Sequence, residues 1–371
     1  MSNVIQNQYT PDYVSPPGET LQEIIEEQGM TQAELAERTG RPKKTINEII
    51  NGKAAITPET ALQLERVLNI PASFWNNREQ QYREALARQE EQNRLQEKIT
   101  WLDKIPIKAM IKLKWIQYFP DKVEQLRETL NFFAVASPKQ WEEIWSNTDT
   151  DFRKSQSFQS DLGAVAAWLR RGEIEASQIH CANYNADKFQ ETLLKIRALT
   201  VEPPEIFQTE VVRLCAESGV AVVFIPQLPK TRTSGATRWL NPNKALIQLS
   251  LRYKSDDHLW FAFFHEAGHI LLHGKRDTFL EEKKFISTEN QEKEEEANQF
   301  AADILIPPKE FKQFLASGQQ RKKAAIEQFA TRIGISPGIV VGRLQHDQIL
   351  QPSHCNELKR KFQWVPVEVR K

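Results

Sequence analysis

The sequence predicts a mostly helical α+β protein with an all-α N-terminal domain, a helical middle region and a C-terminal α+β domain with a small β-sheet. Short helical patterns separated by glycines run through residues 16–70. Apolar residues keep helical spacing between positions 100 and 200, and the runs that indicate strands come after Pro203-Pro204. The expected boundaries are 11–82, 83–200 and 203–348, with a tail over 349–371.

Length and composition set the class of protein. With 371 residues, the chain is long enough for two or three domains. Its 49 basic residues balance 49 acidic ones, so any binding to nucleic acid has to rest on a local patch. Three widely spaced cysteines, Cys181, Cys215 and Cys355, fit reduced thiols. The sequence shows neither an apolar signal core nor a membrane-length apolar run, so we expect a cytoplasmic protein that makes no membrane contact.

Two short helices are expected one after the other near the N-terminus. Thr31-Gln32-Ala33-Glu34 is a capping box, in which two side chains satisfy backbone N–H groups at the start of a helix. Gly40 ends this helix, and a second helix follows over residues 42–51 before Gly52. Such a pair predicts a helix-turn-helix, whose second helix reads the DNA major groove.

The second helix carries the side chains that DNA binding needs. Residues 38–53 hold five Lys and Arg against one acidic residue, although residues 1–80 hold seven basic and eleven acidic ones. Cations bind phosphates, and amide and hydroxyl groups hydrogen-bond base edges. The candidate contacts to operator DNA are Gln32, Arg41, Lys43, Lys44, Thr45 and Asn47. The alternative is a helical protein-interaction module that has lost DNA binding.

Several short motifs of the N-terminal segment occur together. They are Pro17-Gly18-Glu19, Leu35-Ala36, the run Ile49-Ile50-Asn51-Gly52-Lys53, and Ala61-Leu62-Gln63-Leu64 leading to Trp75. Through them, residues 11–82 resemble the HigA-type branch of the XRE helix-turn-helix family. The resemblance implies an antitoxin-like repressor of its own operon, with a cognate toxin as a candidate partner. We expect a homodimer on two half-sites about one DNA turn apart.

The middle of the chain gives structure but no function. Residues 77–99 are rich in Gln, Glu and Arg and predict a solvent-exposed helix that connects two domains. Tryptophans such as Trp101, Trp141 and Trp168 then recur among helical patterns, which indicates packing surface. A spacer, a dimerisation and a sensing role all stay open for this region.

A short histidine motif organises the C-terminal part. His265 and His269 are four residues apart, so on a helix they can offer two imidazole nitrogens to one metal ion, with Glu266 beside them. Zinc with an open position for water, and a glutamate to accept the water proton, is the chemistry of a zinc protease. The alternative is a buried amphipathic helix with incidental histidines.

The sequence around the motif supports this assignment. Asp256-Asp257 stand where a helix N-cap is expected, and Gly274 stands where the helix should stop. Strands are expected over 220–226, 234–240 and 244–250. A strand directly before the metal helix could pair with an extended substrate and present its amide to the metal.

Two histidines do not complete a catalytic zinc site, so a third ligand must come from elsewhere. The metzincin extension fails, because the chain has Leu272 and Lys275 where glycine and histidine would be needed. His273 lies about 40° further round the helix than His269 and is a poor ligand. A better source is the acidic helix over 292–308, whose buried stripe of alanines favours close helix packing.

The histidine helix, the acidic helix with its Leu305-Ile306-Pro307 end, and the run over 335–345 together resemble the ImmA/IrrE metallopeptidase family, over residues 203–348. The resemblance implies Zn²⁺ bound by His265, His269 and Glu294, with Glu266 as the general base. The third position could instead shift to Glu295 or Glu296. No oxyanion-stabilising residue is identified; Arg252, Tyr253 and His258 are the nearest candidates in the chain.

Three functions compete. The first is a DNA-binding regulator with a zinc endopeptidase domain that cleaves a repressor or antitoxin under stress. The second is a HigA-like antitoxin or repressor whose metallopeptidase domain is a non-catalytic sensing or binding module. The third is a zinc-stabilised scaffold. A structural zinc site closes with four protein ligands and needs no acid beside it, so Glu266 favours an enzyme.

Overall fold

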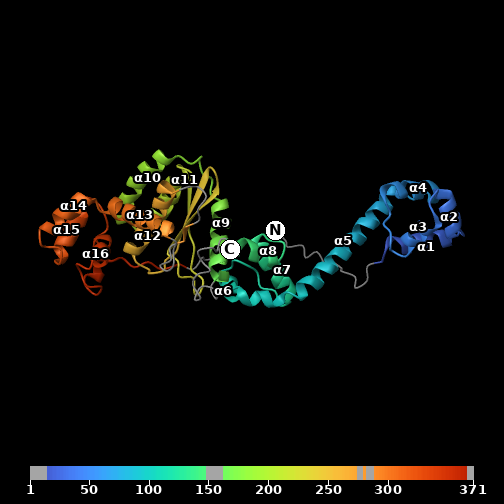
Figure 1. Ribbon diagram of the computed structural model, residues 1–371, viewed down its shortest axis with the longest axis horizontal. Coiled ribbons are helices and arrows are strands. Elements are labelled where there is room, and N and C mark those ends of the chain that lie inside the picture. The colour runs from blue at the N-terminus through green and yellow to red at the C-terminus, as the bar shows by residue number, and fades with distance from the viewer. Residues whose placement is uncertain (1–14, 148–161, 274–278, 281–287, 366–371) are drawn as a thin grey trace. The chain divides into compact units, whose positions relative to one another are not determined.

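The computed structural model describes residues 15–147, 162–273, 279–280 and 288–365 (Figure 1). The chain divides into two compact units, residues 1–99 and residues 100–371. Both are rich in helices, and the second also contains one small sheet, so the predicted mostly helical α+β class is confirmed. None of the helices in the described part of the chain is long and apolar enough to cross a membrane.

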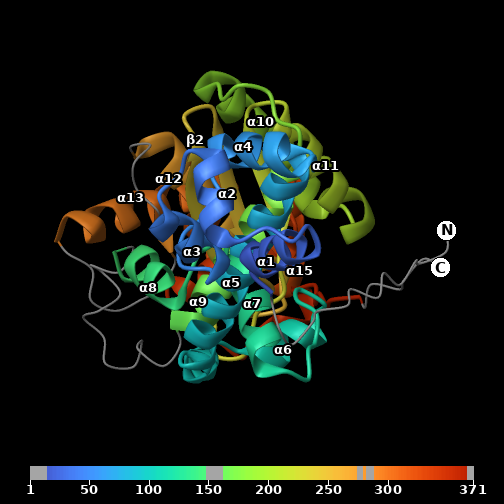
Figure 2. The same ribbon diagram turned by 90° about the vertical axis from the view of Figure 1, so that its right-hand side faces the viewer.

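The first unit is all-helical (Figures 1 and 2). Its helices are α1 (Pro17–Glu27), α2 (Gln32–Thr39), α3 (Lys43–Ile50), α4 (Pro58–Leu68) and α5 (Ala72–Gln96). Leu21, Ile46, Leu64 and Trp75 are fully buried in one core. Most of α5 beyond Trp75 is exposed, as expected for a connecting helix. The domain end expected at residue 82 therefore falls inside a continuous helix.

The predicted helix-turn-helix is formed by α2 and α3. The Thr31 hydroxyl accepts a hydrogen bond from the Glu34 backbone N–H at 3.2 Å, and the Glu34 carboxylate accepts one from the Thr31 N–H at 3.1 Å. Gly40 ends α2 with φ 69°, which glycine adopts without strain. Gly18 brings α1 against α3, because a Cβ there would lie 2.1 Å from the Ile49 carbonyl oxygen.

The middle region is helical, as predicted, and one of its helices packs on the sheet of the second unit. Its helices are α6 (Ile107–Lys112), α7 (Lys122–Phe133), α8 (Pro138–Asn147), α9 (Leu162–Ser177) and α10 (Ala186–Ala198), and α11 (Pro204–Ala216) follows at the start of the next expected domain. Trp168 on α9 donates its indole N–H to the Ile225 carbonyl at 3.1 Å. Phe189 and Leu193 on α10 lie in the same core as the histidine helix. The core therefore extends across the boundary expected near residue 200.

Within the described residues, the sheet has four strands in the order β1-β3-β2-β4. They are β1 (Val220–Phe224), β2 (Gly235–Asn241), β3 (Lys244–Leu249) and β4 (Phe279–Leu280). β3 pairs with β1 in parallel and with β2 in antiparallel orientation. The expectation that the strand directly before the histidine helix receives substrate is therefore wrong, because β3 is hydrogen-bonded on both sides.

The histidine helix is α12 (Asp256–Leu272), and its N-cap differs from the prediction. Ser255 is the N-cap residue, while Asp256 and Asp257 lie in the first turn and are buried. Asp256 accepts a hydrogen bond from the Ser336 hydroxyl at 2.5 Å, and Lys359 forms a 2.6 Å ion pair with Asp257. The two aspartates thus anchor the helix to other parts of the unit instead of capping it. Gly274, the expected stop, lies outside the described residues.

The remaining helices are α13 (Thr288–Leu305), α14 (Pro308–Ala316), α15 (Lys323–Ile333) and α16 (Pro337–His346). The segment expected as a tail after residue 348 is partly integrated into the fold. Leu350 and Leu358 join the core, and Arg360 pairs with Asp256 at 3.4 Å. The Arg360 side chain also donates hydrogen bonds to backbone carbonyls of Thr200, Val201 and Glu202, so it ties the C-terminal segment to the residues just before α11.

Candidate metal centre and nucleic-acid interface

α12 places His265 and His269 on one buried face. Their side chains are each 1% exposed, and the two Nε2 atoms lie 3.0 Å apart. The four-residue spacing brings them one above the other, as the sequence predicted.

α13 packs against this face of α12 and brings the third side chain. A Cβ on Gly268 would lie 3.1 Å from the Phe300 ring and 3.3 Å from the Ala297 Cα, so glycine and alanine permit the close approach. Glu294 then reaches both histidines, with its two oxygens 3.3 Å from Nε2 of His265 and 3.3 Å from Nε2 of His269.

These three side chains form the one group of His, Cys, Asp and Glu in the described part of the chain that could hold a metal ion. Ligand atoms about 2.0–2.2 Å from a tetrahedral ion lie roughly 3.3–3.6 Å from one another. The observed separations of 3.0–3.3 Å are close to this. Two imidazole nitrogens and one carboxylate are also a ligand set that zinc prefers, so the residues fit the ion.

Burial and hydrogen bonds together set the charge states of His269 and Glu294. Burial lowers the pKa of His269 to about 4, although its hydrogen bond to Glu294 acts to raise this pKa. Burial would raise the pKa of Glu294, but hydrogen bonds from His265 and His269 outweigh it and lower the pKa to about 2. At neutral pH the site therefore offers a neutral imidazole and an ionised carboxylate, the forms that bind a metal ion.

Glu266 is fully buried beside strand β2. A Cβ on Gly235 would lie 2.6 Å from its Oε1 and 2.7 Å from its Cγ. The hydroxyl of Thr237 donates a hydrogen bond to the Glu266 backbone carbonyl at 3.1 Å. Glycine at position 235 thus leaves room for the carboxylate, and the sequence pattern of β2 did not reveal this role.

Further side chains contact the ring nitrogens of His265 and His269 that do not face Glu294. His265 Nδ1 lies 3.0 Å from Asn298 Oδ1, and His269 Nδ1 lies 2.9 Å from His273 Nδ1. His273 Nε2 lies 3.1 Å from Glu296 Oε2. Sequence reasoning did not identify Asn298 as a functional residue, although its position four residues after Glu294 places both on one face of α13.

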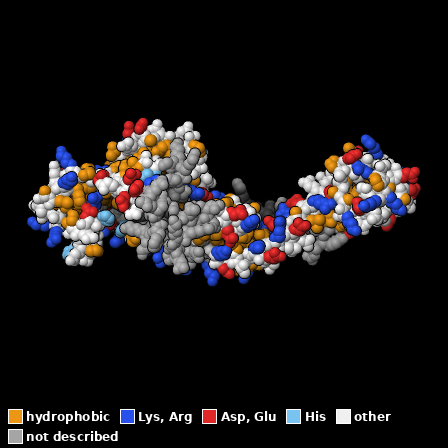
Figure 3. Space-filling view, viewed as in Figure 1, with side chains coloured by type: hydrophobic (Ala, Val, Ile, Leu, Met, Phe, Trp, Pro, Cys, Tyr) orange, Lys and Arg blue, Asp and Glu red, His pale blue; other side chains and the backbone are white. Residues whose placement is uncertain are grey.

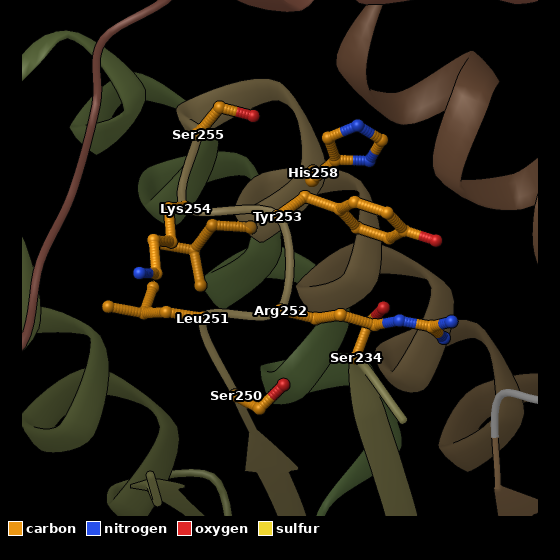
Figure 4. Close-up of a pocket in the computed structure, with 9 residues that line it drawn as sticks. Ser234, Ser250, Leu251, Arg252, Tyr253, Lys254, Ser255 and His258 are labelled. Atoms are coloured by element: carbon orange, nitrogen blue, oxygen red, sulfur yellow. The ribbon is translucent and has the colours of Figure 1, made fainter. Parts of the chain in front are cut away.

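A small pocket lies at the N-terminal end of α12 (Figure 4). It contains the three side chains considered for oxyanion stabilisation. The rings of Tyr253 and His258 stack with centroids 4.2 Å apart, and the Arg252 guanidinium lies 5.1 Å from the Tyr253 centroid. Ser234 at the pocket precedes Gly235, so the pocket borders the segment that contacts Glu266. None of the three is assigned to the reaction.

The nucleic-acid interface is expected on α2 and α3. Gln32 and Asn47 lie next to each other, because the side-chain nitrogen of Asn47 is 3.4 Å from the side-chain oxygen of Gln32. The Gln32 side chain in turn donates a hydrogen bond to the side-chain oxygen of Gln22 at 2.9 Å. Lys43 and Lys44 are exposed in the first turn of α3, and Thr45 is partly buried beside them. The structure therefore groups five of the six expected contacts around these two helices.

Arg41, the sixth candidate contact, is partly buried and pairs within the domain. Its Nε donates to Gln63 at 2.7 Å, and its NH2 forms a 3.0 Å ion pair with Glu59. Arg41 thus joins the turn between α2 and α3 to α4, because both partners reach it from that helix. Figure 3 shows Lys and Arg interspersed with Asp and Glu on the visible face of the first unit, in agreement with its mixed charge.

The fold and the site thus define a helix-turn-helix domain followed by an α+β domain with a His-His-Glu cluster. Residues 21–75 match the helix-turn-helix family, and residues 215–345 match the IrrE N-terminal-like domain of the M78 peptidases. The chain therefore carries a helix-turn-helix DNA-binding domain of transcriptional regulators and an IrrE-like peptidase domain, which confirms both resemblances.

Individual relatives match only a small part of the chain. Virulence-associated protein A of Dichelobacter nodosus is 40% identical over 52 residues, which are 14% of this chain and 51% of that protein. The uncharacterized HTH-type transcriptional regulator YddM of Escherichia coli K12 is 33% identical over 61 residues, 16% of this chain and 65% of that protein. A solved addiction module antidote protein of a HigA family from Coxiella burnetii is 27% identical, with TM-score 0.21, over 23% of this chain and 92% of that one.

Proposed function

We propose that this protein is a DNA-binding regulator whose second domain is a zinc-dependent endopeptidase that cleaves a regulatory protein, such as a repressor or an antitoxin. One observation carries the proposal: His265, His269 and Glu294 converge on one point, and a second buried carboxylate, Glu266, is the neighbour of His265 on α12. A structural metal site would need neither the free fourth position nor the extra carboxylate.

The chain's own residues have distinct roles in the proposed reaction. His265, His269 and Glu294 would hold zinc, which when bound polarises the scissile carbonyl and makes water more acidic. Glu266 accepts a proton from the attacking water and gives it to the leaving amine nitrogen as the C–N bond breaks. The test is the exchange Glu266→Gln, because it removes this base and keeps the proposed ligands.

The competing function is a repressor whose metal domain senses or binds without cleaving. The match to a helix-turn-helix family and the similarity to an HTH-type transcriptional regulator favour it. In this case Glu266→Gln would leave the levels of all cellular proteins unchanged, which separates the two functions.

Gly235→Ala is expected to impair cleavage and preserve zinc binding. The new methyl group would lie 2.6 Å from the Glu266 Oε1, so the carboxylate must move from the position that this structure shows. We expect a loss of about 10-fold or more in the cleavage rate, since small displacements of a general base are costly. Zinc content of the same preparation is the internal control. A variant that cleaves at the normal rate would show that the carboxylate's present position is not required.

Replacing Lys43 and Lys44 by alanine is expected to weaken DNA binding and its dependence on salt. Both side chains are exposed on α3, where they can contact phosphates. Each lost phosphate contact should flatten the plot of log affinity against log salt by about one unit. Arg66→Ala, which removes an exposed charge on α4, is the control and should leave the slope unchanged. Equal affinity of the double variant and the wild type across salt concentrations would contradict the assignment of α3.

A further inference from the structure

We propose that His273 and Glu296 are positioning residues that orient the His269 ring for metal binding through a chain of hydrogen bonds. This inference rests on the proposed metal centre and adds a supporting set of residues to it. His273 lies one turn beyond His269 at the end of the same helix. From the sequence alone, His273 was predicted only to be a poor metal ligand.

The geometry is continuous from the metal position to the protein surface. His269 directs Nε2 toward Glu294 at 3.3 Å and Nδ1 toward His273 Nδ1 at 2.9 Å. His273 Nε2 then lies 3.1 Å from a Glu296 oxygen. The His273 side chain is 3% exposed, whereas Glu296 is 64% exposed. The chain of hydrogen bonds therefore begins at a buried metal ligand, His269, and ends at a solvent-exposed carboxylate, Glu296.

Only one arrangement of protons is possible along this chain of hydrogen bonds when a metal is bound. A neutral His269 that binds through its Nε2 lone pair must carry its proton on Nδ1. That N–H can be donated to His273 only if His273 Nδ1 is an acceptor, so the His273 proton is on Nε2. This second N–H is donated to Glu296, a carboxylate that accepts. Each bond fixes the tautomer of the next ring.

The other histidine ligand is supported in the same way by a single residue. His265 Nδ1 lies 3.0 Å from Asn298 Oδ1, which can accept the equivalent N–H. Glu294, Glu296 and Asn298 are all on α13. This one helix therefore supplies a metal ligand, Glu294, and two acceptors. Asn298 can accept from the His265 ring, and Glu296 ends the chain of hydrogen bonds that starts at the His269 ring. Groups that orient histidine ligands typically contribute about 10–100-fold to metal affinity.

A purely structural role for His273 is the competing explanation, because it is the C-cap residue of α12. Its cap uses the backbone N–H, which donates to the His269 carbonyl at 3.2 Å. Side-chain substitutions leave this bond in place. The two roles therefore make different predictions for the side chain.

The experiment measures zinc affinity of the full chain by competition with a chelator, for wild type, His273→Phe, His273→Asn, Glu296→Ala and Glu295→Ala. Phenylalanine keeps the ring and removes both nitrogens, whereas the asparagine oxygen can occupy the place of Nδ1 and accept from His269. We expect zinc affinity to be about 10–100-fold weaker in His273→Phe, and most of the lost affinity to return in His273→Asn. Glu296→Ala should lose less affinity than His273→Phe, and Glu295→Ala should keep the wild-type affinity.

Two further measurements separate orientation from folding. Urea unfolding of the zinc-free proteins should give similar midpoints, and long-range ¹H–¹⁵N spectra should show less of the Nδ1–H tautomer of His269 in His273→Phe. Wild-type affinity in His273→Phe, or equal losses in the phenylalanine and asparagine variants, would overturn the proposal. A wild type that binds zinc and cleaves nothing would overturn the proposed peptidase function and leave this inference standing. A wild type that binds no zinc would overturn both.

Discussion

Glu266→Gln is expected to keep its zinc and lose its proteolytic activity. Glutamine has the shape of glutamate but cannot accept the proton of the attacking water at neutral pH. The three proposed ligands are other residues. Glu266 is fully buried beside Gly235, and glutamine fits the same space because it has the same size, so the exchange changes little else. Removal of a general acid–base typically costs about 10²–10⁴-fold in rate.

The measurement compares intact protein levels by quantitative mass spectrometry in cells that express wild type or variant, with and without stress. A substrate should accumulate in the Glu266→Gln cells, and DNA binding by the first unit should stay unchanged. Glu295→Gln, the same exchange at an exposed carboxylate, is the matched control. If no protein accumulates specifically in the variant under any stress tested, the non-catalytic repressor becomes the better assignment.

Glu294→Ala is expected to release zinc, whereas Glu295→Ala should retain it. Glu294 reaches both histidines at 3.3 Å, and Glu295 is exposed and accepts a hydrogen bond from Gln291. Loss of one of three protein ligands should exceed the roughly 10–100-fold effect of a supporting residue. Zinc per chain, measured by elemental analysis after dialysis, should therefore fall steeply only for Glu294→Ala.

The neighbouring glutamates make this comparison informative, because the sequence could not exclude Glu295 or Glu296 as the ligand. Glu296 faces His273 at 3.1 Å, so its removal should have an intermediate effect. Equal zinc loss in the Glu294 and Glu295 variants, or retention in both, would contradict Glu294 as the third ligand.

Several features that depend on local sequence were predicted correctly, although the N-cap expected at Asp256-Asp257 is Ser255. The capping box at Thr31 and Glu34 and the glycine at position 40 define α2 because their hydrogen bonds and backbone angles involve residues close in the chain. The spacing of His265 and His269 likewise places both on one helical face. The strands expected over 220–226, 234–240 and 244–250 correspond to β1, β2 and β3, whereas β4 was not predicted.

Features that depend on contacts between distant residues were decided only by the tertiary structure. β3 is a central strand because β1 pairs on its other side, which no local pattern reveals. Asp256 and Asp257 serve as anchors because Arg360 and Lys359 return to them from the end of the chain. The sequence by itself determined the two-histidine helix and the capped helix pair. The tertiary structure decided which glutamate meets the histidines, because that depends on how closely Gly268 and Ala297 let two helices approach.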